Sequence, residues 1–191
     1  MTTYQDRWMN GRVVEKGTRE CASRYEIVRE FCKGFQGPFT VCDIGANMCY
    51  FGIRLTEDFP ECKVTAFEFD HYQLRADHVR ASGADRVHLM KLKVSPADCV
   101  ALAESGQFDL VLALSVLHHV PEQFQEWLTA LRVLGRNVIL EMAVEDSQRY
   151  GRARSKGYYV PGGKMLGYGE SHLDGKVLRP IVLLTGDSNE L

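Results

Sequence analysis

The sequence predicts an α/β domain in which helices cover a mostly parallel central sheet, a three-layer sandwich. Two observations lead to this prediction. From residue 40 onward, short runs of Val, Ile, Leu and Phe alternate with longer amphipathic stretches, as in successive βα units. In addition, the run FDLVLALSVL at residues 108–117 is apolar on both faces, which is typical of a buried parallel strand.

The predicted strands are the apolar runs at residues 40–46, 63–70, 87–94, 108–117, 137–144 and 177–185, and we expect the last one to be antiparallel. Helices are predicted at residues 50–58, 72–82, 96–104 and 121–134, and another at 18–35. In the 121–134 segment, Phe124, Trp127 and Leu131 recur at helical spacing. Many glycines interrupt residues 145–176, so the pattern defines no elements there.

Length and composition suit one ordinary globular domain. The chain has 191 residues, of which 45% are hydrophobic and 25% charged. Its formal net charge of -2 argues against a protein that coats nucleic acid, because such binding neutralises many phosphates. We find no apolar run long enough to cross a bilayer and no apolar segment at the N-terminus, so we expect a cytoplasmic protein without a membrane partner.

Six cysteines are scattered along the chain without a CxxC pair. Several of them lie in apolar runs, so we interpret them as reduced and mostly buried thiols. The HExxH pattern is also missing from the sequence. We therefore expect no metal site.

The strongest chemical signal is the segment VCDIGANMCYFG at residues 41–52. It places Asp43 at the end of an apolar strand, a turn containing Gly45 and Ala46 after it, and then a helix. Small residues let a bound molecule approach the backbone, and the start of a helix offers free N–H groups. The Asp43 carboxylate could accept a hydrogen bond from an ammonium group.

A second acid, Glu68, lies at the end of the next predicted strand, in the segment AFEFD. In nucleotide-binding βαβ units, an acid at this place accepts hydrogen bonds from ribose hydroxyls. The dinucleotide fingerprint GxGxxG is missing, since the sequence from Gly45 is GANMCY. These features favour a mononucleoside cofactor over NAD or FAD.

Taken together, DIGANMCYF, AFEFD and FDLVLALSVLHHV resemble the class I S-adenosylmethionine-dependent methyltransferases, which have a Rossmann-like fold. The resemblance covers roughly residues 40–145. It implies S-adenosylmethionine as the cofactor, with Glu68 on the ribose and Ser95 near the adenine. The residues that it implies to line the cofactor are Asp43, Gly45, Ala46, Asn47, Cys49, Glu68, Phe69, Ser95 and Leu114. The family commonly has glycine where this chain has Cys49, and we expect cofactor binding to survive that change.

The resemblance divides one methyltransferase domain, residues 1–191, into three parts. Residues 1–39 form an N-terminal arm and helix, 40–145 the cofactor-binding core, and 146–191 an acceptor-side loop and the final strand. In the arm, Arg19 could meet the carboxylate of the cofactor, although an arm that is disordered or simply packed is at least an equal alternative.

His118 and His119 follow the fourth strand of the core, where the resemblance places the methyl acceptor. A hydroxyl acceptor needs a base to take its proton, and histidine, with an ordinary pKa of about 6.5, suits that role. The alternative is that these histidines only cap the strand. Further acceptor candidates are Glu141, His172, Arg149 and Tyr158, and for Glu141 an ion pair with a nearby cation is an equal alternative. Arg149 and Tyr158 lie in residues 145–164, whose local charge excess of +3 could recognise an anionic acceptor or form a solvated face.

The sequence therefore predicts a methyltransferase that methylates an oxygen of a small molecule or sugar. Neither NPPY nor DPPY occurs, which disfavours amino-methylation of DNA, and the patterns GxxxxGK[ST] and GxSxG are also missing. An RNA or protein acceptor is one alternative function. The other alternative is a scaffold that binds the cofactor without catalysis.

Overall fold

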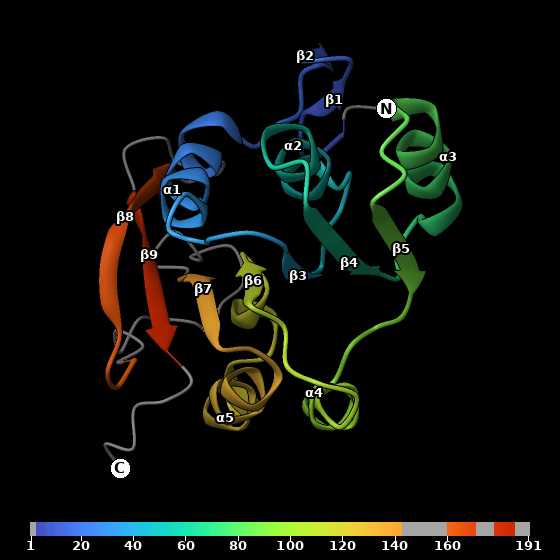
Figure 1. Cartoon of the computed structure of the whole chain (residues 1–191). Coiled ribbons are helices and arrows are strands. Elements are labelled where there is room, and N and C mark those ends of the chain that lie inside the picture. Colours follow the sequence, from blue (N-terminus) through green and yellow to red (C-terminus); the bar gives the residue numbers. More distant parts are fainter. Residues whose placement is uncertain (1–2, 143–159, 171–177, 186–191) are drawn as a thin grey trace. The chain divides into compact units, whose positions relative to one another are not determined.

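A computed structural model of the chain describes residues 3–142, 160–170 and 178–185 (Figure 1). The chain forms two compact units, Met1–Val94 and Ser95–Leu191, called here the first and the second unit. Three of the acceptor candidates, Arg149, Tyr158 and His172, lie outside the described residues.

The first unit contains three parallel strands, β3 (Phe39–Ile44), β4 (Cys62–Glu68) and β5 (Val87–Lys91), in the order β5-β4-β3. Helix α2 (Tyr50–Asp58) connects β3 to β4, and α3 (Tyr72–Ser82) connects β4 to β5. Both helices have the predicted bounds. Five of the six side chains of β3 are buried, as expected for a parallel strand that is covered on both faces.

Helix α2 packs on all three of these strands. Its apolar side chains Phe51, Ile53 and Leu55 are at most 1% exposed. Gly52 lies against β4, where a Cβ atom would stand 3.1 Å from Cγ1 of Val64. The missing side chain thus lets the helix approach the strand closely, and this places the start of α2 beside the end of β3.

Before these strands, the first unit has a hairpin of β1 (Arg7–Met9) and β2 (Arg12–Glu15), followed by helix α1 (Ala22–Cys32). The predicted helix at 18–35 was therefore too long at both ends, and the hairpin was not predicted. Its turn residues Asn10 and Gly11 have φ angles of 52° and 72°, the left-handed pair that a two-residue hairpin turn requires.

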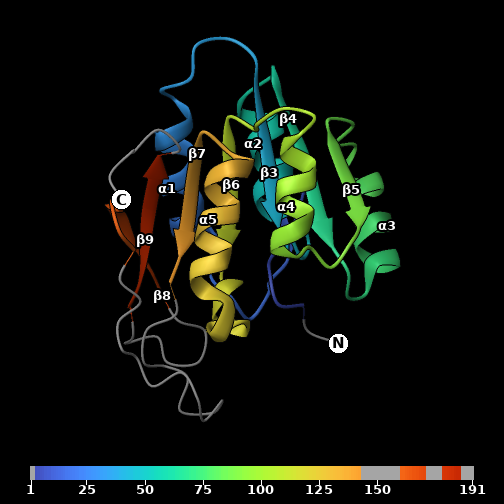
Figure 2. The same ribbon diagram turned by 90° about the horizontal axis from the view of Figure 1, so that it is seen from below.

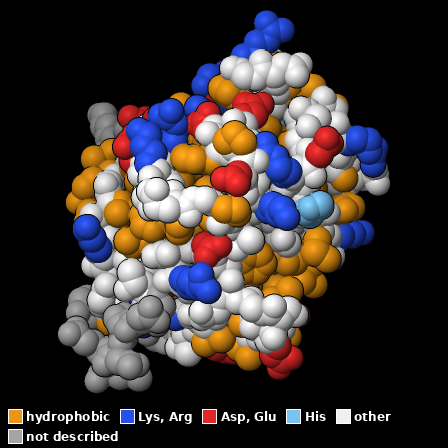
Figure 3. Space-filling model, in the orientation of Figure 1, with side chains coloured by type: hydrophobic (Ala, Val, Ile, Leu, Met, Phe, Trp, Pro, Cys, Tyr) orange, Lys and Arg blue, Asp and Glu red, His pale blue; other side chains and the backbone are white. Residues whose placement is uncertain are grey.

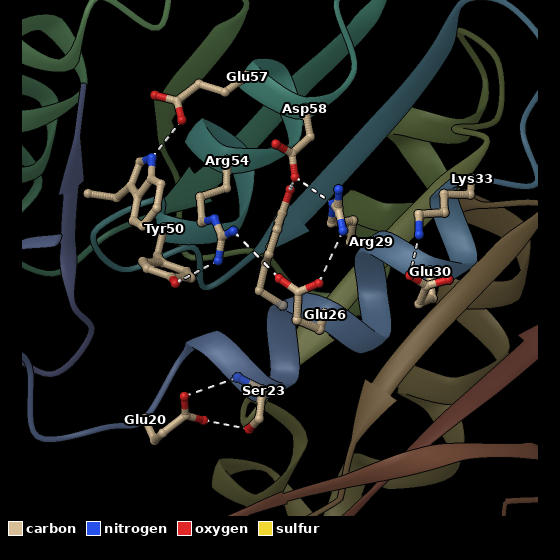
Figure 4. A network of polar contacts seen from close by, with 12 residues as sticks. Glu20, Ser23, Glu26, Arg29, Glu30, Lys33, Tyr50, Arg54, Glu57 and Asp58 are labelled. Atoms are coloured by element: carbon tan, nitrogen blue, oxygen red, sulfur yellow. Dashed lines mark hydrogen bonds and ion pairs between the residues drawn. The ribbon is translucent and has the colours of Figure 1, made fainter. Parts of the chain in front are cut away.

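Aromatic and polar contacts fasten α1 and the hairpin to α2 (Figure 4). The Arg54 guanidinium lies 3.8 Å from the ring centroid of Tyr25 on α1 and 4.4 Å from that of Trp8 on β1. The Tyr25 hydroxyl donates a hydrogen bond to Asp58 at 2.8 Å, and Trp8 Nε1 donates to Glu57 at 2.6 Å. Since a cation held between two rings contributes on the order of 1 kcal/mol per contact, Arg54 is the centre of this attachment.

The second unit begins with helix α4 (Pro96–Ala103) and strand β6 (Leu110–Leu114). Two short 3₁₀ turns, η1 (Leu117–His119) and η2 (Pro121–Gln123), then lead into α5 (Phe124–Leu134) and β7 (Asn137–Glu141). Strands β8 (Lys164–Glu170) and β9 (Leu178–Thr185) complete it. Helices α4 and α5 lie side by side, and α5 packs on β7 (Figure 2).

Strands β6 and β7 are parallel, β9 is antiparallel to β7, and β8 is antiparallel to β9. The α/β class, the parallel strands and the antiparallel final strand are therefore confirmed. Strand β8 was not predicted, because Gly167 and Gly169 weaken its pattern and its pairing with β9 stabilises it instead. Strand β6 is shorter than the predicted 108–117 at both ends, and it ends early because the chain leaves the sheet at Ser115, whose φ is 61°.

All six cysteines are free and buried, as the sequence predicted. Among the described residues, none of the helices is long and apolar enough to cross a membrane. On the face drawn in Figure 3, Lys and Arg side chains are interspersed with Asp and Glu, in keeping with the balanced total charge.

His78 on α3 gives a first test of the packing between α3 and the N-terminal hairpin. The residue is 1% exposed, and neither ring nitrogen has a hydrogen-bond partner among the described residues. Burial, and then the charge of Arg7 on β1, lower the pKa of His78 to about 4, while Glu15 on β2 opposes them. Between pH 6.5 and about 4, His78 is protonated in the unfolded chain but not in the folded chain. The folded state therefore loses stability as the pH falls through this range.

We predict that His78→Leu removes this loss. The stability of the variant relative to the wild type should rise as the pH is lowered from 6.5 to 4, by about 3 kcal/mol at most. Urea unfolding at several pH values measures this difference. His88→Leu, at an exposed position, is the control, and an equal pH response of both variants would contradict the burial argument.

Candidate functional site

The loop between β3 and α2 has the unusual backbone that its small residues permit. Gly45, Asn47 and Cys49 have φ angles of 70°, 51° and 56°, all in the left-handed region. The backbone N–H groups of Gly45 and Ala46 both donate to the carbonyl oxygen of Phe67 on β4, at 2.9 and 3.1 Å. The loop is therefore fixed to the neighbouring strand at its first two residues.

Cys49 occupies the residue before α2 in a conformation that favours glycine. The family glycine expected at this position thus has a physical reason, and the chain keeps the same backbone with a side chain that costs about 1–2 kcal/mol there. The thiol is fully buried. Burial, followed by the charges of Asp43 and Glu68, raises the pKa of Cys49 well above its usual value, so the thiol stays protonated and is not a nucleophile.

Glu68 makes four close contacts around the loop. Its Oε2 accepts a hydrogen bond from the backbone N of Asn47 at 2.9 Å and lies 2.6 Å from Nη1 of Arg75 on α3. Its Oε1 accepts from the backbone N of Phe69 and of Asp70, at 2.8 and 3.0 Å. The structure thus brings Glu68, the acid predicted for the ribose, to the loop that contains Gly45. Because a carboxylate has about four acceptor positions, a sugar hydroxyl would take the place of one of these donors.

Asp43, in contrast, has an unused oxygen. The residue is 3% exposed, and its Oδ2 has no hydrogen-bond partner among the described residues. Burial, and then the charge of Glu68, raise the pKa of Asp43 to about 7, while Arg24 of α1 opposes them. A buried carboxyl with a free acceptor oxygen is the group that an incoming ammonium would complete.

The N-terminal arm packs on the start of α2. Gln5 Oε1 accepts a hydrogen bond from the backbone N of Tyr50 at 3.4 Å, and Gln5 forms a parallel β-bridge with Arg19. Both residues are buried, Gln5 at 6% and Arg19 at 0% exposure. Gly17 permits this crossing, since a Cβ there would lie 2.3 Å from the carbonyl carbon of Gln5. The arm is thus a packed part of the first unit.

Phe69 and Ser95 are both predicted to line the cofactor. Their side chains differ in how far present contacts already occupy them. The Phe69 ring is 50% exposed and lies 5.9 Å from Nζ of Lys91. Ser95 caps α4, since its hydroxyl accepts from the backbone N of Asp98 at 3.3 Å and its own N–H donates to the Asp98 carboxylate at 2.8 Å. The Ser95 side chain is therefore engaged in a capping box.

In the second unit, polar side chains gather at the carboxyl end of β6. Leu114, the last residue of β6, pairs with Glu141 of β7 in the parallel register. The hydroxyl of the next residue, Ser115, donates to Glu141 at 2.5 Å and accepts from Nη1 of Arg179 on β9 at 3.2 Å. Glu141 and Arg179 are each 1% exposed. The acceptor candidate Glu141 is thus part of a buried polar cluster, and Arg179 is a member that the sequence did not suggest.

Both predicted catalytic histidines lie on η1, which follows this cluster. Their ring centroids are 4.0 Å apart with an angle of 38° between the planes. His119 is exposed, yet partial burial of its ring and then the positive charge of Arg179 lower its pKa. His119 is therefore neutral at physiological pH, which is the form that can accept a proton.

Comparison with known proteins now decides the family. Residues 42–137, half of the chain, match the methyltransferase domain family. The chain belongs to this family. The resemblance to class I methyltransferases is confirmed, and the cofactor that this family uses is S-adenosylmethionine.

One curated relative is the O-antigen chain terminator bifunctional methyltransferase/kinase WbdD of Escherichia coli, 25% identical over 143 residues, which are 69% of this chain and 20% of WbdD. The chain thus spans about a fifth of the length of the curated relatives that it matches. A crystal structure of WbdD has a TM-score of 0.74 at 20% identity and covers 90% of this chain and 41% of that one.

Two further solved structures have the same fold. Magnesium protoporphyrin IX methyltransferase (ChlM) from Synechocystis PCC 6803, with bound S-adenosylhomocysteine, has a TM-score of 0.58 at 18% identity over 85% of this chain and 80% of that one. The N-terminal domain of EvdMO1, studied with S-adenosylhomocysteine and D-fucose, has a TM-score of 0.58 at 16% identity over 95% of this chain and 75% of that one.

The titration of Asp43 gives a second prediction. Because its pKa of about 7 in the folded chain exceeds the usual 3.8, the folded state holds a proton that the unfolded state releases, and stability falls as the pH rises from 4 to 7. Asp43→Asn should therefore be more stable than the wild type above pH 7, by up to about 4 kcal/mol, with the gain vanishing near pH 4. Thermal unfolding across this pH range measures it, with the exposed Asp85→Asn as the control. A gain that is independent of pH would contradict the assignment.

Proposed function

We propose that this protein binds S-adenosylmethionine and transfers its methyl group to an oxygen of a small molecule or sugar. One observation carries the proposal: a buried carboxyl oxygen of Asp43, at the end of β3 where the glycine-type loop begins, has no hydrogen-bond partner in the described part of the chain. An amino acid moiety with an ammonium group would satisfy it, and the methionine end of the cofactor has one.

The first unit supplies the proposed binding residues. Asp43 would accept from the ammonium group, and the left-handed loop at Gly45, Ala46 and Asn47 would let the ligand approach the backbone. Glu68 would accept from a ribose hydroxyl in exchange for one of its present donors. The hydrogen bond that Glu68 accepts from the backbone N of Asn47 would maintain the conformation of the loop.

The second unit supplies the proposed base. S-adenosylmethionine provides a methyl group on a sulfonium, which an oxygen nucleophile can displace. The acceptor hydroxyl becomes that nucleophile when its proton is taken up, and the neutral, accessible ring of His119 is suited to take it. His118 packs against this ring and would limit its rotation.

A sugar or other small molecule is the acceptor that the relatives favour. EvdMO1 was studied with D-fucose, and ChlM is named for a porphyrin substrate. Arg149, Tyr158 and His172 stay candidates for acceptor recognition, with a preference for an anionic group. An RNA or protein acceptor is the alternative, and acceptor binding that weakens steeply with salt would favour RNA.

Isothermal titration with S-adenosylhomocysteine tests the cofactor site, and we expect binding. Glu68→Ala should weaken it by about 1–3 kcal/mol, because the variant loses charged hydrogen-bond acceptors and frees the loop. The exposed Glu61→Ala is the matched control and should bind as the wild type does. A folded protein that binds no S-adenosylhomocysteine would overturn the proposal, and unchanged affinity in Glu68→Ala would remove the ribose assignment.

Replacement of His119 tests the proposed base. His119→Asn should lower kcat by about 10²–10⁴-fold with little change in KM for the cofactor, because only proton transfer is lost. His118→Asn is the matched neighbour and should have a smaller effect. Formation of S-adenosylhomocysteine with a panel of sugar and phenolic acceptors measures both. No turnover with any acceptor, despite cofactor binding, would favour the scaffold.

A further inference from the structure

The backbone of Ser115 is strained where β6 ends. Its φ of 61° lies in the left-handed region, where a side chain costs about 1–2 kcal/mol. Such a conformation persists only where surrounding contacts hold it. Here the contacts are the hydrogen bonds of the Ser115 hydroxyl to Glu141 on β7 and from Arg179 on β9.

Strands β7 and β9 bring Glu141 and Arg179 to the Ser115 hydroxyl. Glu141 pairs with Ile181 in the antiparallel register of β7 and β9, and the backbone N of Met142 donates to the carbonyl oxygen of Pro180 at 2.9 Å. The ends of the two strands are thus bonded to each other next to the Ser115 hydroxyl. Since Glu141 and Arg179 are both buried at 1% exposure, their opposite charges stand in an environment of low polarity.

Ser115 lies just before the turn that carries His118 and His119. The backbone N of His119 donates to the carbonyl oxygen of Val116 at 3.1 Å, and that of Val120 donates to Leu117 at 3.1 Å. These short-range bonds set the turn geometry relative to Ser115. A change in the Ser115 backbone would therefore rotate the turn and displace both imidazole rings.

We propose that Ser115 and Arg179 are positioning residues for His119: the Ser115 hydroxyl, held by Glu141 and Arg179, fixes the turn that presents the His119 ring to a methyl acceptor. This proposal rests on the proposed function of His119 as the base. Neither residue need touch the acceptor.

Arg179 has a second effect on the same ring. Charged and titratable groups at this turn include His118 on the turn itself, Glu122 on η2, Glu141 on β7 and Arg179 on β9. The positive charge of Arg179 adds to burial in lowering the pKa of His119. The residue that fixes the turn thus also favours the neutral imidazole that can accept a proton.

The proposal is tested by the titration of the His119 ring, followed by NMR in ¹³C- and ¹⁵N-labelled protein without cofactor or acceptor. The His119 signal is assigned with His119→Asn. In the wild type we expect a midpoint below that of an ordinary histidine. Arg179→Lys keeps the charge and should keep the midpoint low. The double variant Glu141→Gln with Arg179→Met removes both charges, so it leaves no buried ion unpaired, and it should move the midpoint of His119 upward. The exposed His88 of the first unit is the internal reference.

Ser115→Ala separates positioning from charge. It keeps both charges and removes the hydroxyl that they hold, so we expect a lower kcat for methyl transfer, an unchanged KM for the cofactor, and altered ring chemical shifts for His118 and His119. A His119 titration that is the same in the double variant and the wild type, or a Ser115→Ala protein with wild-type ring shifts, would overturn the proposal. A wild-type protein that fails to bind S-adenosylhomocysteine would instead overturn the proposed function, and the titration results would not depend on it.

Discussion

The four contacts of the Glu68 carboxylate are the constraint on which the cofactor loop depends. They join the end of β4, the loop after β3 and helix α3, and one of them holds the backbone N of Asn47. Each hydrogen bond to a charged group contributes about 1.5–3 kcal/mol net, which is enough to offset the left-handed conformations at Asn47 and Cys49. The carbonyl oxygen of Phe67 on β4 holds Gly45 and Ala46, and Glu68 adds the hydrogen bond that holds Asn47.

The Glu68 carboxylate also adds to the free-energy cost of ionising Asp43. Burial of Asp43 raises its pKa most, and the charge of Glu68 at the end of the adjacent strand raises it further. Arg75 compensates Glu68 directly, whereas Arg24 opposes the shift at Asp43 only in part. The first unit therefore holds a carboxyl that is close to half-protonated at neutral pH and has an acceptor oxygen to spare. This is a source of binding energy for a cationic ligand, because the ligand removes the cost of ionising Asp43.

Helices α2 and α3 and the two acids Asp43 and Glu68 were predicted from the residues next to them in the sequence. Helices α2 and α3 have their predicted bounds because their amphipathic spacing and flanking strands agree. Asp43 and Glu68 were predicted at the ends of successive strands, and parallel strands bring their carboxyl ends to one edge of the sheet. The hairpin could also have been predicted, since Asn10 and Gly11 form the commonest two-residue turn signal. Strand β8 could not, because its order comes from β9 and not from its own residues.

The arginines near Glu68 and Glu141 could not be predicted from local sequence patterns, for a different reason. Arg75 and Arg179 act through long side chains whose targets lie elsewhere in the chain, so no spacing rule links them to Glu68 or Ser115. Yet each arginine meets an acid that the sequence did predict, Glu68 in one unit and Glu141 in the other.

A buried carboxylate needs a cation or several N–H donors, so predicting a buried acid also predicts that a partner exists, even when its identity is hidden. The two units differ in what these carboxylates hold: Glu68 accepts from three backbone N–H groups, which fixes a loop, whereas Glu141 and Arg179 both hydrogen-bond the Ser115 hydroxyl, which fixes a turn. Removing that hydroxyl therefore disturbs the turn while both charges stay in place, so the effect of geometry can be separated from the effect of charge in the second unit. In the first unit they cannot be separated, since the same oxygen of Glu68 contacts both Arg75 and the loop.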